Sequence, residues 1–227
     1  MNKVFCMTLL GLSVAFGANV QTLTQQCEVN NAKACYDLGV AYIQGKGIAK
    51  NLSKGFKFVK KSCDLGYAEG CEGTGEFYAV GQGTSKNLSK AFEYYKKSCD
   101  MGDAVGCQNT SVGYRDSIGI AKDLSKAFEF AKKACGMGFA DGCTNVGFAY
   151  KNGKGVAKDL SKAFEYYKKA CNMGSAAGCS NLGSVYYNGE GVKKDINAAK
   201  NYSKKACGMG DKDACKNYKI MLKQGGR

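Results

Sequence analysis

The stretch KKSCDLGYAEGC, residues 60–71, places two cysteines eight positions apart with a glycine-bearing segment between them. Close variants recur as KKSCDMGDAVGC, KKACGMGFADGC, KKACNMGSAAGC and KKACGMGDKDAC. Each cysteine pair is displaced from the preceding pair by 36 residues. A fixed period of this length is typical of a solenoid, in which small supersecondary units stack on one another.

Each unit reads as two helices separated by glycine-containing turns. In the fourth unit, apolar residues at helical spacing predict a first helix over Cys143–Asn152. Asp159 is a suitable N-cap for a second helix, and Lys169 lies in its last turn, where positive charge suits the helix dipole. Gly174 can adopt the left-handed conformation just beyond that helix. The repeating unit is therefore predicted to be an α-helical hairpin.

The cysteines allow two pairing schemes. Cys63 lies at the end of the second helix of one unit and Cys71 at the start of the first helix of the next, so the turn brings them within disulfide reach. Pairing across the open end of each hairpin would leave Cys27 and Cys215 without partners. Local pairing uses all twelve cysteines from Cys27 onward, and each bridge then contributes roughly 2–3 kcal/mol by restricting the unfolded chain. The six predicted bridges are Cys27–Cys35, Cys63–Cys71, Cys99–Cys107, Cys135–Cys143, Cys171–Cys179 and Cys207–Cys215.

The N-terminus has the layout of a secretory signal peptide. Lys3 precedes an apolar run that is too short to span a bilayer, and small residues follow this run. Removal of residues 1–18 takes Cys6 away and leaves an even number of cysteines, as expected for a disulfide framework. We therefore predict an exported protein, periplasmic or secreted, with no transmembrane segment after signal removal.

The formal net charge of +14 favours loose electrostatic attraction to acidic surfaces. The lysines recur at fixed positions near predicted helix ends, so a solvated helical face explains them better than nucleic-acid binding does. The chain has no histidine, and its cysteines lack the spacing of a zinc site. We predict no nucleic-acid partner, no metal, no cofactor and a monomeric state.

Two segments carry a resemblance to a known family. LGSVYYNGEGVKKD, residues 182–195, and DLSKAFEYYKKACNMG, residues 159–174, resemble the Sel1-like repeat, a relative of the tetratricopeptide repeat. The cysteine pairs resemble those of the secreted cysteine-rich proteins of Helicobacter and related bacteria. The resemblance implies an all-α, right-handed α/α solenoid of 36-residue repeats that acts as an interaction scaffold. The predicted segments are a signal peptide (1–18), a partial repeat (19–34), five repeats (35–70, 71–106, 107–142, 143–178 and 179–214) and a partial repeat (215–227).

The resemblance also implies an enzymatic alternative, because members of the cysteine-rich family carry the name β-lactamase. A serine β-lactamase needs S-x-x-K and K-T-G motifs, which the chain lacks, and a zinc enzyme needs histidines. The sequence predicts no catalytic residue. Recognition of cell-wall peptide would reconcile scaffold and β-lactam binding, because penicillin mimics the D-Ala-D-Ala end of that peptide.

The favoured function is binding of a peptide or protein, from the host or the cell wall, on the concave surface that the first helices line. Asparagines recur there in register and could form a ladder for an extended peptide backbone: Asn109, Asn145, Asn181 and Asn217. The alternative is that they cap the first helices or bond across repeat junctions. A variable position that could set specificity carries Arg115, Lys151 and Tyr187. The recurring tyrosine and phenylalanine stripes are predicted to be core.

Overall fold

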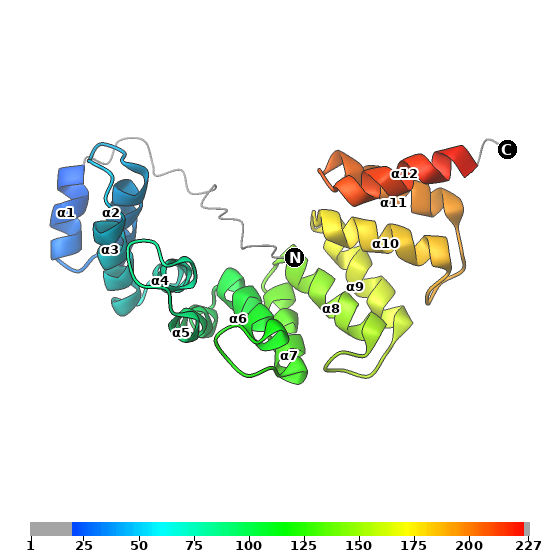
Figure 1. Ribbon diagram of the computed structural model, residues 1–227, viewed down its shortest axis with the longest axis horizontal. Coiled ribbons are helices and arrows are strands. Elements are labelled where there is room, and N and C mark those ends of the chain that lie inside the picture. The colour runs from blue at the N-terminus through cyan, green and yellow to red at the C-terminus, as the bar shows by residue number, and fades with distance from the viewer. Residues whose placement is uncertain (1–19, 225–227) are drawn as a thin grey trace. The chain divides into compact units, whose positions relative to one another are not determined.

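The computed structural model describes residues 20–224, which form twelve helices and no strand (Figure 1). The predicted all-α fold is confirmed, whereas the predicted signal peptide lies outside the described residues. The helices are α1 (Val20–Glu28), α2 (Ala32–Gln44), α3 (Leu52–Asp64), α4 (Ala68–Val80), α5 (Leu88–Asp100), α6 (Ala104–Asp116), α7 (Leu124–Gly136), α8 (Ala140–Asn152), α9 (Leu160–Asn172), α10 (Ala176–Asn188), α11 (Ile196–Gly208) and α12 (Lys212–Gln224).

The helices alternate between two kinds, and two compact units divide the chain between Lys86 and Asn87. We call the even-numbered helices A helices and the odd-numbered helices B helices. Five repeats result, each an A helix followed by a B helix, from α2–α3 to α10–α11. Within the second unit, consecutive helices pack against each other and the A helices α8 and α10 are also in contact. This stacking is the arrangement expected of a solenoid.

Capping residues fix where each B helix begins and ends. The Asp159 carboxylate accepts a hydrogen bond from the Lys162 backbone N–H at 2.9 Å, which confirms the predicted N-cap of α9. An equivalent cap precedes α7, where Asp123 accepts from Lys126 at 2.9 Å. Gly174 follows α9 with φ of 93°, the left-handed region that its position predicted.

The A helices begin three residues earlier than predicted. The expected first helix of the fourth repeat was Cys143–Asn152, but α8 begins at Ala140. In the next repeat the Ser175 hydroxyl accepts from the Gly178 N–H at 3.0 Å and starts α10 at Ala176. A turn of three residues is therefore enough to reverse the chain, and the cysteine becomes the fourth residue of its A helix.

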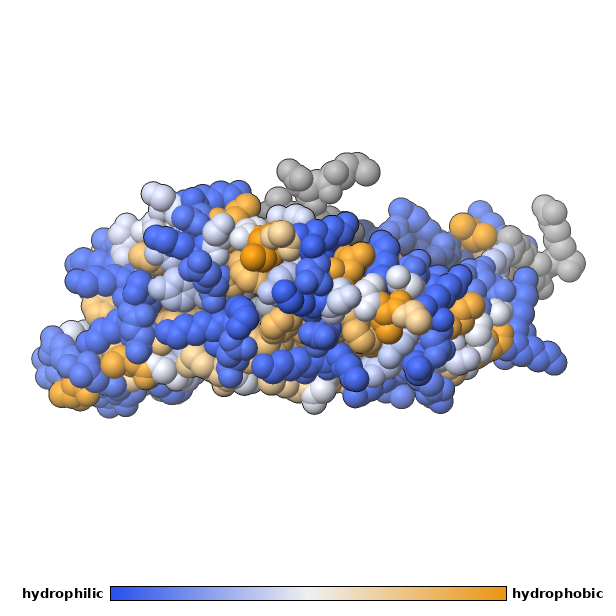
Figure 2. Space-filling view, turned by 90° about the horizontal axis from the view of Figure 1, so that it is seen from below, coloured by the Kyte–Doolittle hydropathy of each residue, from blue (hydrophilic) through white to orange (hydrophobic). Residues whose placement is uncertain are grey.

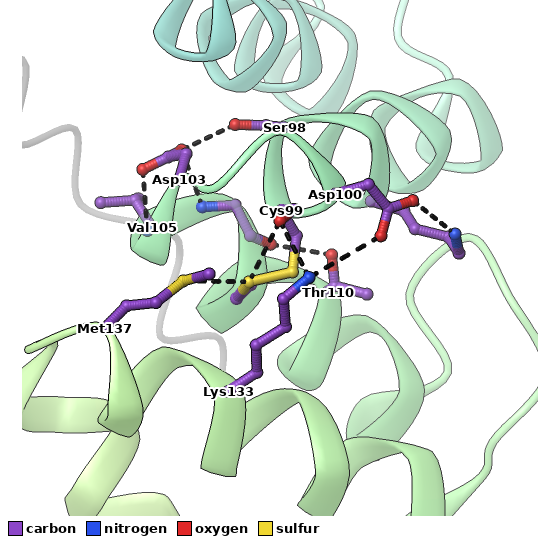
Figure 3. The surroundings of a disulfide bond; sticks show 11 residues. Ser98, Cys99, Asp100, Asp103, Val105, Thr110, Lys133 and Met137 are labelled. Atoms are coloured by element: carbon purple, nitrogen blue, oxygen red, sulfur yellow. Dashed lines mark hydrogen bonds and ion pairs between the residues drawn. A yellow bond between two sulfur atoms is a disulfide. The ribbon is translucent and has the colours of Figure 1, made fainter.

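All six predicted disulfides are present. Their Cα–Cα distances range from 4.4 to 4.6 Å, at the short end of the range that a disulfide can bridge. Figure 3 shows the bridge between Cys99 and Cys107, with the Asp103 carboxylate accepting from two backbone N–H groups at the start of α6. A side chain at Gly106 would place its Cβ 2.7 Å from the Cys99 nitrogen. At this bridge glycine therefore permits the close approach of the two helices, whereas the first and last bridges have alanine, Ala34 and Ala214, at the same position.

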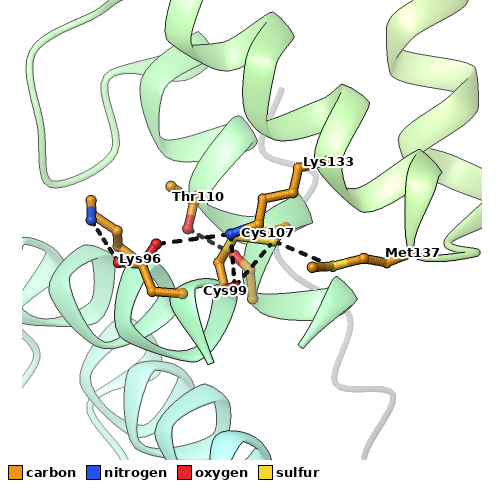
Figure 4. A network of polar contacts seen from close by, with 8 residues as sticks. Lys96, Cys99, Cys107, Thr110, Lys133 and Met137 are labelled. Carbon is orange, nitrogen blue, oxygen red and sulfur yellow. Dashed lines mark hydrogen bonds and ion pairs between the residues drawn. A yellow bond between two sulfur atoms is a disulfide. The ribbon is translucent and has the colours of Figure 1, made fainter. Parts of the chain in front are cut away.

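Three of the junctions are also held by a lysine of the next B helix. Lys133 of α7 donates to the Cys99 carbonyl at 3.1 Å and lies 4.0 Å from the Asp100 carboxylate (Figure 4). The Met137 sulfur lies 3.8 Å from the sulfur of Cys107. The same lysine-to-carbonyl bond joins Lys61 to Cys27 at 2.7 Å and Lys205 to Cys171 at 3.4 Å. At these junctions a B helix thus contacts the disulfide-bridged turn that precedes its own repeat.

The aromatic stripes are core, as predicted. Tyr150 of α8 meets Phe128 edge to face at 5.3 Å and stacks on Tyr166 at 5.7 Å. Tyr186 of α10 repeats the arrangement, with Phe164 at 5.5 Å and Tyr202 at 5.6 Å. These are the preferred geometries of aromatic pairs, so α8 and α10 are each fixed between two B helices.

Hydrophilic side chains cover much of the face shown in Figure 2, with hydrophobic residues scattered among them. This agrees with lysines that occupy solvated helix ends rather than a core. Within residues 20–224, no helix combines the length and the apolar character needed to cross a bilayer.

Candidate functional site

Three pockets occur at one register of the repeat. Each is lined by an A helix, the B helix of the same repeat and the A helix of the next repeat. We name them the first-repeat, third-repeat and fifth-repeat pockets. The last has a volume of about 210 Å³, and the other two have about 30 Å³ each. Because their lining residues are related by multiples of 36 positions, they are versions of one site.

The first-repeat pocket is mainly apolar. Its walls include Tyr36, Val59 and Phe77, and Glu76 of α4 is half-buried among them. Burial raises the pKa of the Glu76 carboxyl above its usual value because the charged form loses hydration. An apolar pocket with one acidic group suits a ligand that carries both apolar surface and a hydrogen-bond donor.

The third-repeat pocket brings two predicted site residues together. Arg115 of α6 and Asn145 of α8 both line it. Arg115 donates two hydrogen bonds to Asp116, at 2.9 and 2.7 Å, and these bonds lower the pKa of the Asp116 carboxyl. Lys154 lies over the ring of Phe148 at 5.0 Å. The charged groups at this pocket therefore contact neighbouring side chains, and Asp116 and Lys154 are also exposed to solvent.

The fifth-repeat pocket brings the other predicted pair together. Tyr187 of α10 and Asn217 of α12 line it, with Ser203 of α11 between them and Ile220 and Met221 on the apolar side. Lys194 lies over the Tyr187 ring at 5.3 Å and fixes its orientation. This pocket has uncharged lining residues throughout.

In the fourth repeat the same space is filled. The ring of Tyr167 occupies it, with the side chain 0% exposed. Lys151, a predicted specificity residue, forms an ion pair with Glu190 at 2.7 Å beside it. Lys151 therefore links its own A helix to the loop of the next repeat instead of lining a pocket.

The predicted asparagine ladder is placed on the A helices, but the capping alternative is wrong. Asn181 is the sixth residue of α10, and its side-chain amide donates to the Ala177 carbonyl at 2.9 Å. Asn109 and Asn145 hold the same position in α6 and α8 and are half-buried, whereas Asn217 in α12 is exposed. Contact of these residues with a ligand stays a prediction.

The B-helix position that decides pocket size was missed from the sequence. It is occupied in order by Val59, Tyr95, Ala131, Tyr167 and Ser203. A tyrosine fills the space in the fourth repeat, where its exposed fraction is 0%. The available signal was strong variation at one apolar position within otherwise uniform B helices.

Five segments of the chain match the Sel1 repeat model: residues 32–67, 68–103, 108–139, 140–175 and 176–211. The chain belongs to the Sel1 repeat family. The predicted 36-residue period and solenoid class are thereby confirmed, although four of the five matched segments begin with the A helix rather than with the cysteine, and the third begins within α6 at residue 108. Among curated proteins, none matches the chain.

Solved structures of Sel1 repeat proteins resemble it closely. A Sel1 repeat protein from Oxalobacter formigenes has a TM-score of 0.85 at 25% identity, over 91% of this chain and 84% of that one. The protective antigen c5321 of uropathogenic Escherichia coli has a TM-score of 0.87 at 28% identity, over 92% of this chain. This chain spans 44% of the antigen. Helicobacter pylori cysteine-rich protein B is 40% identical over 57% of this chain and 93% of its own, with a TM-score of 0.47.

The disulfides also bear on location and chemistry. Six bridges are typical of a protein that resides in an oxidising compartment outside the cytoplasm. Within the described residues every cysteine is bridged, so none of these thiols is available as a nucleophile. The β-lactam alternative has no observation on the described residues in its favour and stays a prediction of the resemblance.

Proposed function

We propose that this Sel1 repeat protein is an exported scaffold that binds an extended peptide, or a segment of a partner protein, along its A helices. The observation that carries the proposal is the recurrence of one pocket at a single register of the repeat. The third-repeat pocket holds Arg115 and Asn145, and the fifth-repeat pocket holds Tyr187 and Asn217. Periodic pockets suit a ligand whose side chains also recur at intervals.

Pocket lining differs from repeat to repeat, which supports a role in selectivity. Glu76 lies in the first pocket, Arg115 and Lys154 at the third, and uncharged hydroxyl and amide groups at the fifth. The B helices α5, α7 and α9 are much more uniform in sequence than the A helices that line the pockets. Variation concentrated on the A helices is expected where recognition differs between repeats.

The test begins with oxidised, signal-free protein and a library of displayed peptides. Arg115→Ala and Asn145→Ala should each weaken binding of a selected peptide by about tenfold, as for a contact residue near the centre of an interface. Lys132→Ala removes a cation from the exposed surface of α7 in the same repeat and serves as the matched control. Equal losses from Arg115→Ala and Lys132→Ala would show that general charge, rather than the A-helix surface, determines binding.

A further inference from the structure

The fifth-repeat pocket contains a buried hydroxyl that no neighbour uses. Ser203 is 4% exposed as a residue, it lines the pocket, and within the described residues its hydroxyl forms no hydrogen bond to the protein. Gly183 lies directly opposite, since a Cβ there would be 2.8 Å from the Ser203 oxygen. The hydroxyl therefore opens onto the pocket, where a ligand that displaces water can bond to it.

The fourth repeat shows what fits this space. There the Tyr167 ring lies against Gly147, with two ring carbons 2.8 Å from the position of a Cβ. Tyr167 and Gly147 stand 36 positions before Ser203 and Gly183. Replacement of tyrosine by serine therefore leaves a space shaped for a phenol ring, with the serine hydroxyl inside it.

The size and chemistry of the pocket agree with this reading. An engineered apolar cavity of about 150 Å³ holds benzene, so about 210 Å³ accommodates a phenol. Ile220 and Met221 supply apolar contact, and Asn217 at the exposed rim can bond to a peptide backbone. Because the pocket contains no carboxylate and no cationic group, it favours an uncharged side chain.

The surroundings of the pocket are basic. Helix α12 carries Lys212, Lys216, Lys219 and Lys223, against a single acid, Asp213. Lys216 pairs with Asp213 at 3.1 Å, whereas Lys219 and Lys223 have no ion-pair partner within the described residues. Charge complementarity therefore favours acidic residues on either side of the inserted side chain.

We propose that the fifth-repeat pocket binds a tyrosine side chain of a partner peptide, flanked by acidic residues. The inference rests on the proposed peptide-binding function and names the side chain that the pocket accepts. Ser203 bonds to the phenol hydroxyl, Ile220 and Met221 hold the ring, and Asn217 bonds to the peptide backbone.

The probe is a fluorescein-labelled peptide with a central tyrosine and two glutamates on each side, followed by anisotropy. Ser203→Tyr should raise the Kd by more than about tenfold, because the new ring occupies the pocket. The variant should fold, since tyrosine stands at this position opposite glycine in the fourth repeat. Unchanged circular dichroism and melting temperature verify that it does.

A double-mutant cycle, with one change in the protein and one in the peptide, isolates the contact between the Ser203 hydroxyl and the phenol hydroxyl. Ser203→Ala should weaken the tyrosine peptide by about threefold to tenfold, the usual value of one hydrogen bond, but leave a phenylalanine peptide unaffected. A peptide with central alanine should bind far more weakly to the unaltered protein. Equal binding of tyrosine and alanine peptides, no binding of either, or insensitivity to Ser203→Tyr would overturn the inference.

The two proposals fail separately. If library peptides bind and depend on Arg115 and Asn145 but ignore Ser203→Tyr, the peptide-binding function stands and the tyrosine pocket falls. If no library peptide binds, the broader function falls. The small molecule p-cresol then tests the pocket without a peptide. It should change the methyl chemical shifts of Ile220 and Met221, and Ser203→Tyr should abolish this change.

Discussion

Ser117 adopts a conformation that favours glycine. It ends α6 with φ of 58° and ψ of 41°, whereas Gly153 ends α8 with φ of 65°. A side chain in the left-handed region costs roughly 1–2 kcal/mol, which replacement by glycine would remove. Part of this gain in stability is offset because glycine has greater conformational freedom in the unfolded chain. We therefore expect Ser117→Gly to raise the free energy of unfolding by about 0.5–1 kcal/mol, measured by urea denaturation.

The fourth repeat provides the reverse substitution as a control. Gly153→Ser should lower the free energy of unfolding by a similar amount, because it puts a side chain into the same backbone conformation. A lower urea midpoint for Ser117→Gly would mean that the serine stabilises the end of α6 by contacts that outweigh its backbone cost.

At the scale of the helix pair, one A-helix residue and one B-helix residue share a limited volume. The fourth repeat combines Gly147 with the large Tyr167. The third repeat combines Ser111 with the small Ala131, and the Ser111 hydroxyl donates to the Ala127 carbonyl at 2.7 Å. The larger residue has moved from the B helix to the A helix, so the two positions compensate each other.

A double-mutant cycle on the fourth repeat tests this compensation. Gly147→Ser alone should cost about 1–3 kcal/mol, because its Cβ would lie 2.8 Å from the Tyr167 ring. The same change in a Tyr167→Ala background should cost less, with a coupling of roughly 0.5–3 kcal/mol, since it recreates the serine–alanine pair of the third repeat. Urea unfolding of all four proteins gives the coupling, and strictly additive costs would refute the compensation.

Local chemistry made much of the fold predictable. The Asp159 cap, the left-handed Gly174 and the local cysteine pairs each follow from short-range geometry, which sequence spacing describes directly. The start of α8 was misplaced by three residues because Cys143 was taken as the first helical residue, although in the next repeat Ser175 offers a cap four positions before its cysteine. Possible start positions of a helix differ by only a few residues, so the error amounts to about one helical turn.

At the candidate site, the A-helix residues were predicted from the sequence but the B-helix residue was not. Arg115 and Asn145 were singled out on A helices, and the structure places both at one pocket. Ser203, which was not predicted, lines the fifth-repeat pocket from a B helix. Its place in the pocket depends on how closely that helix packs on Gly183. Volume left between two helices is a property of both side chains together, so no single register of the sequence reveals it.

On the scale of the whole chain, the repeats need covalent support because each buries little apolar surface alone. The disulfides supply it at every junction without linking distant parts of the sequence, since each closes a loop of eight positions. Lysines such as Lys205, which donates to the Cys171 carbonyl, then attach the next B helix to the bridged junction. Stability should consequently be distributed junction by junction.

Removal of one bridge tests that distribution. Cys171 and Cys179 are 1% and 0% exposed, and paired replacement by alanine should lower the free energy of unfolding by about 2–3 kcal/mol, as the chain-entropy model gives for a short loop. Because each repeat contacts only its neighbours, amide hydrogen exchange should accelerate in α9 and α10 and remain unchanged in α5. The paired Cys207→Ala and Cys215→Ala replacement is the control and should move the effect to α11 and α12. Uniform acceleration across α5–α12 in either variant would instead show that the second unit unfolds as one cooperative block, with the bridges acting on all of it at once.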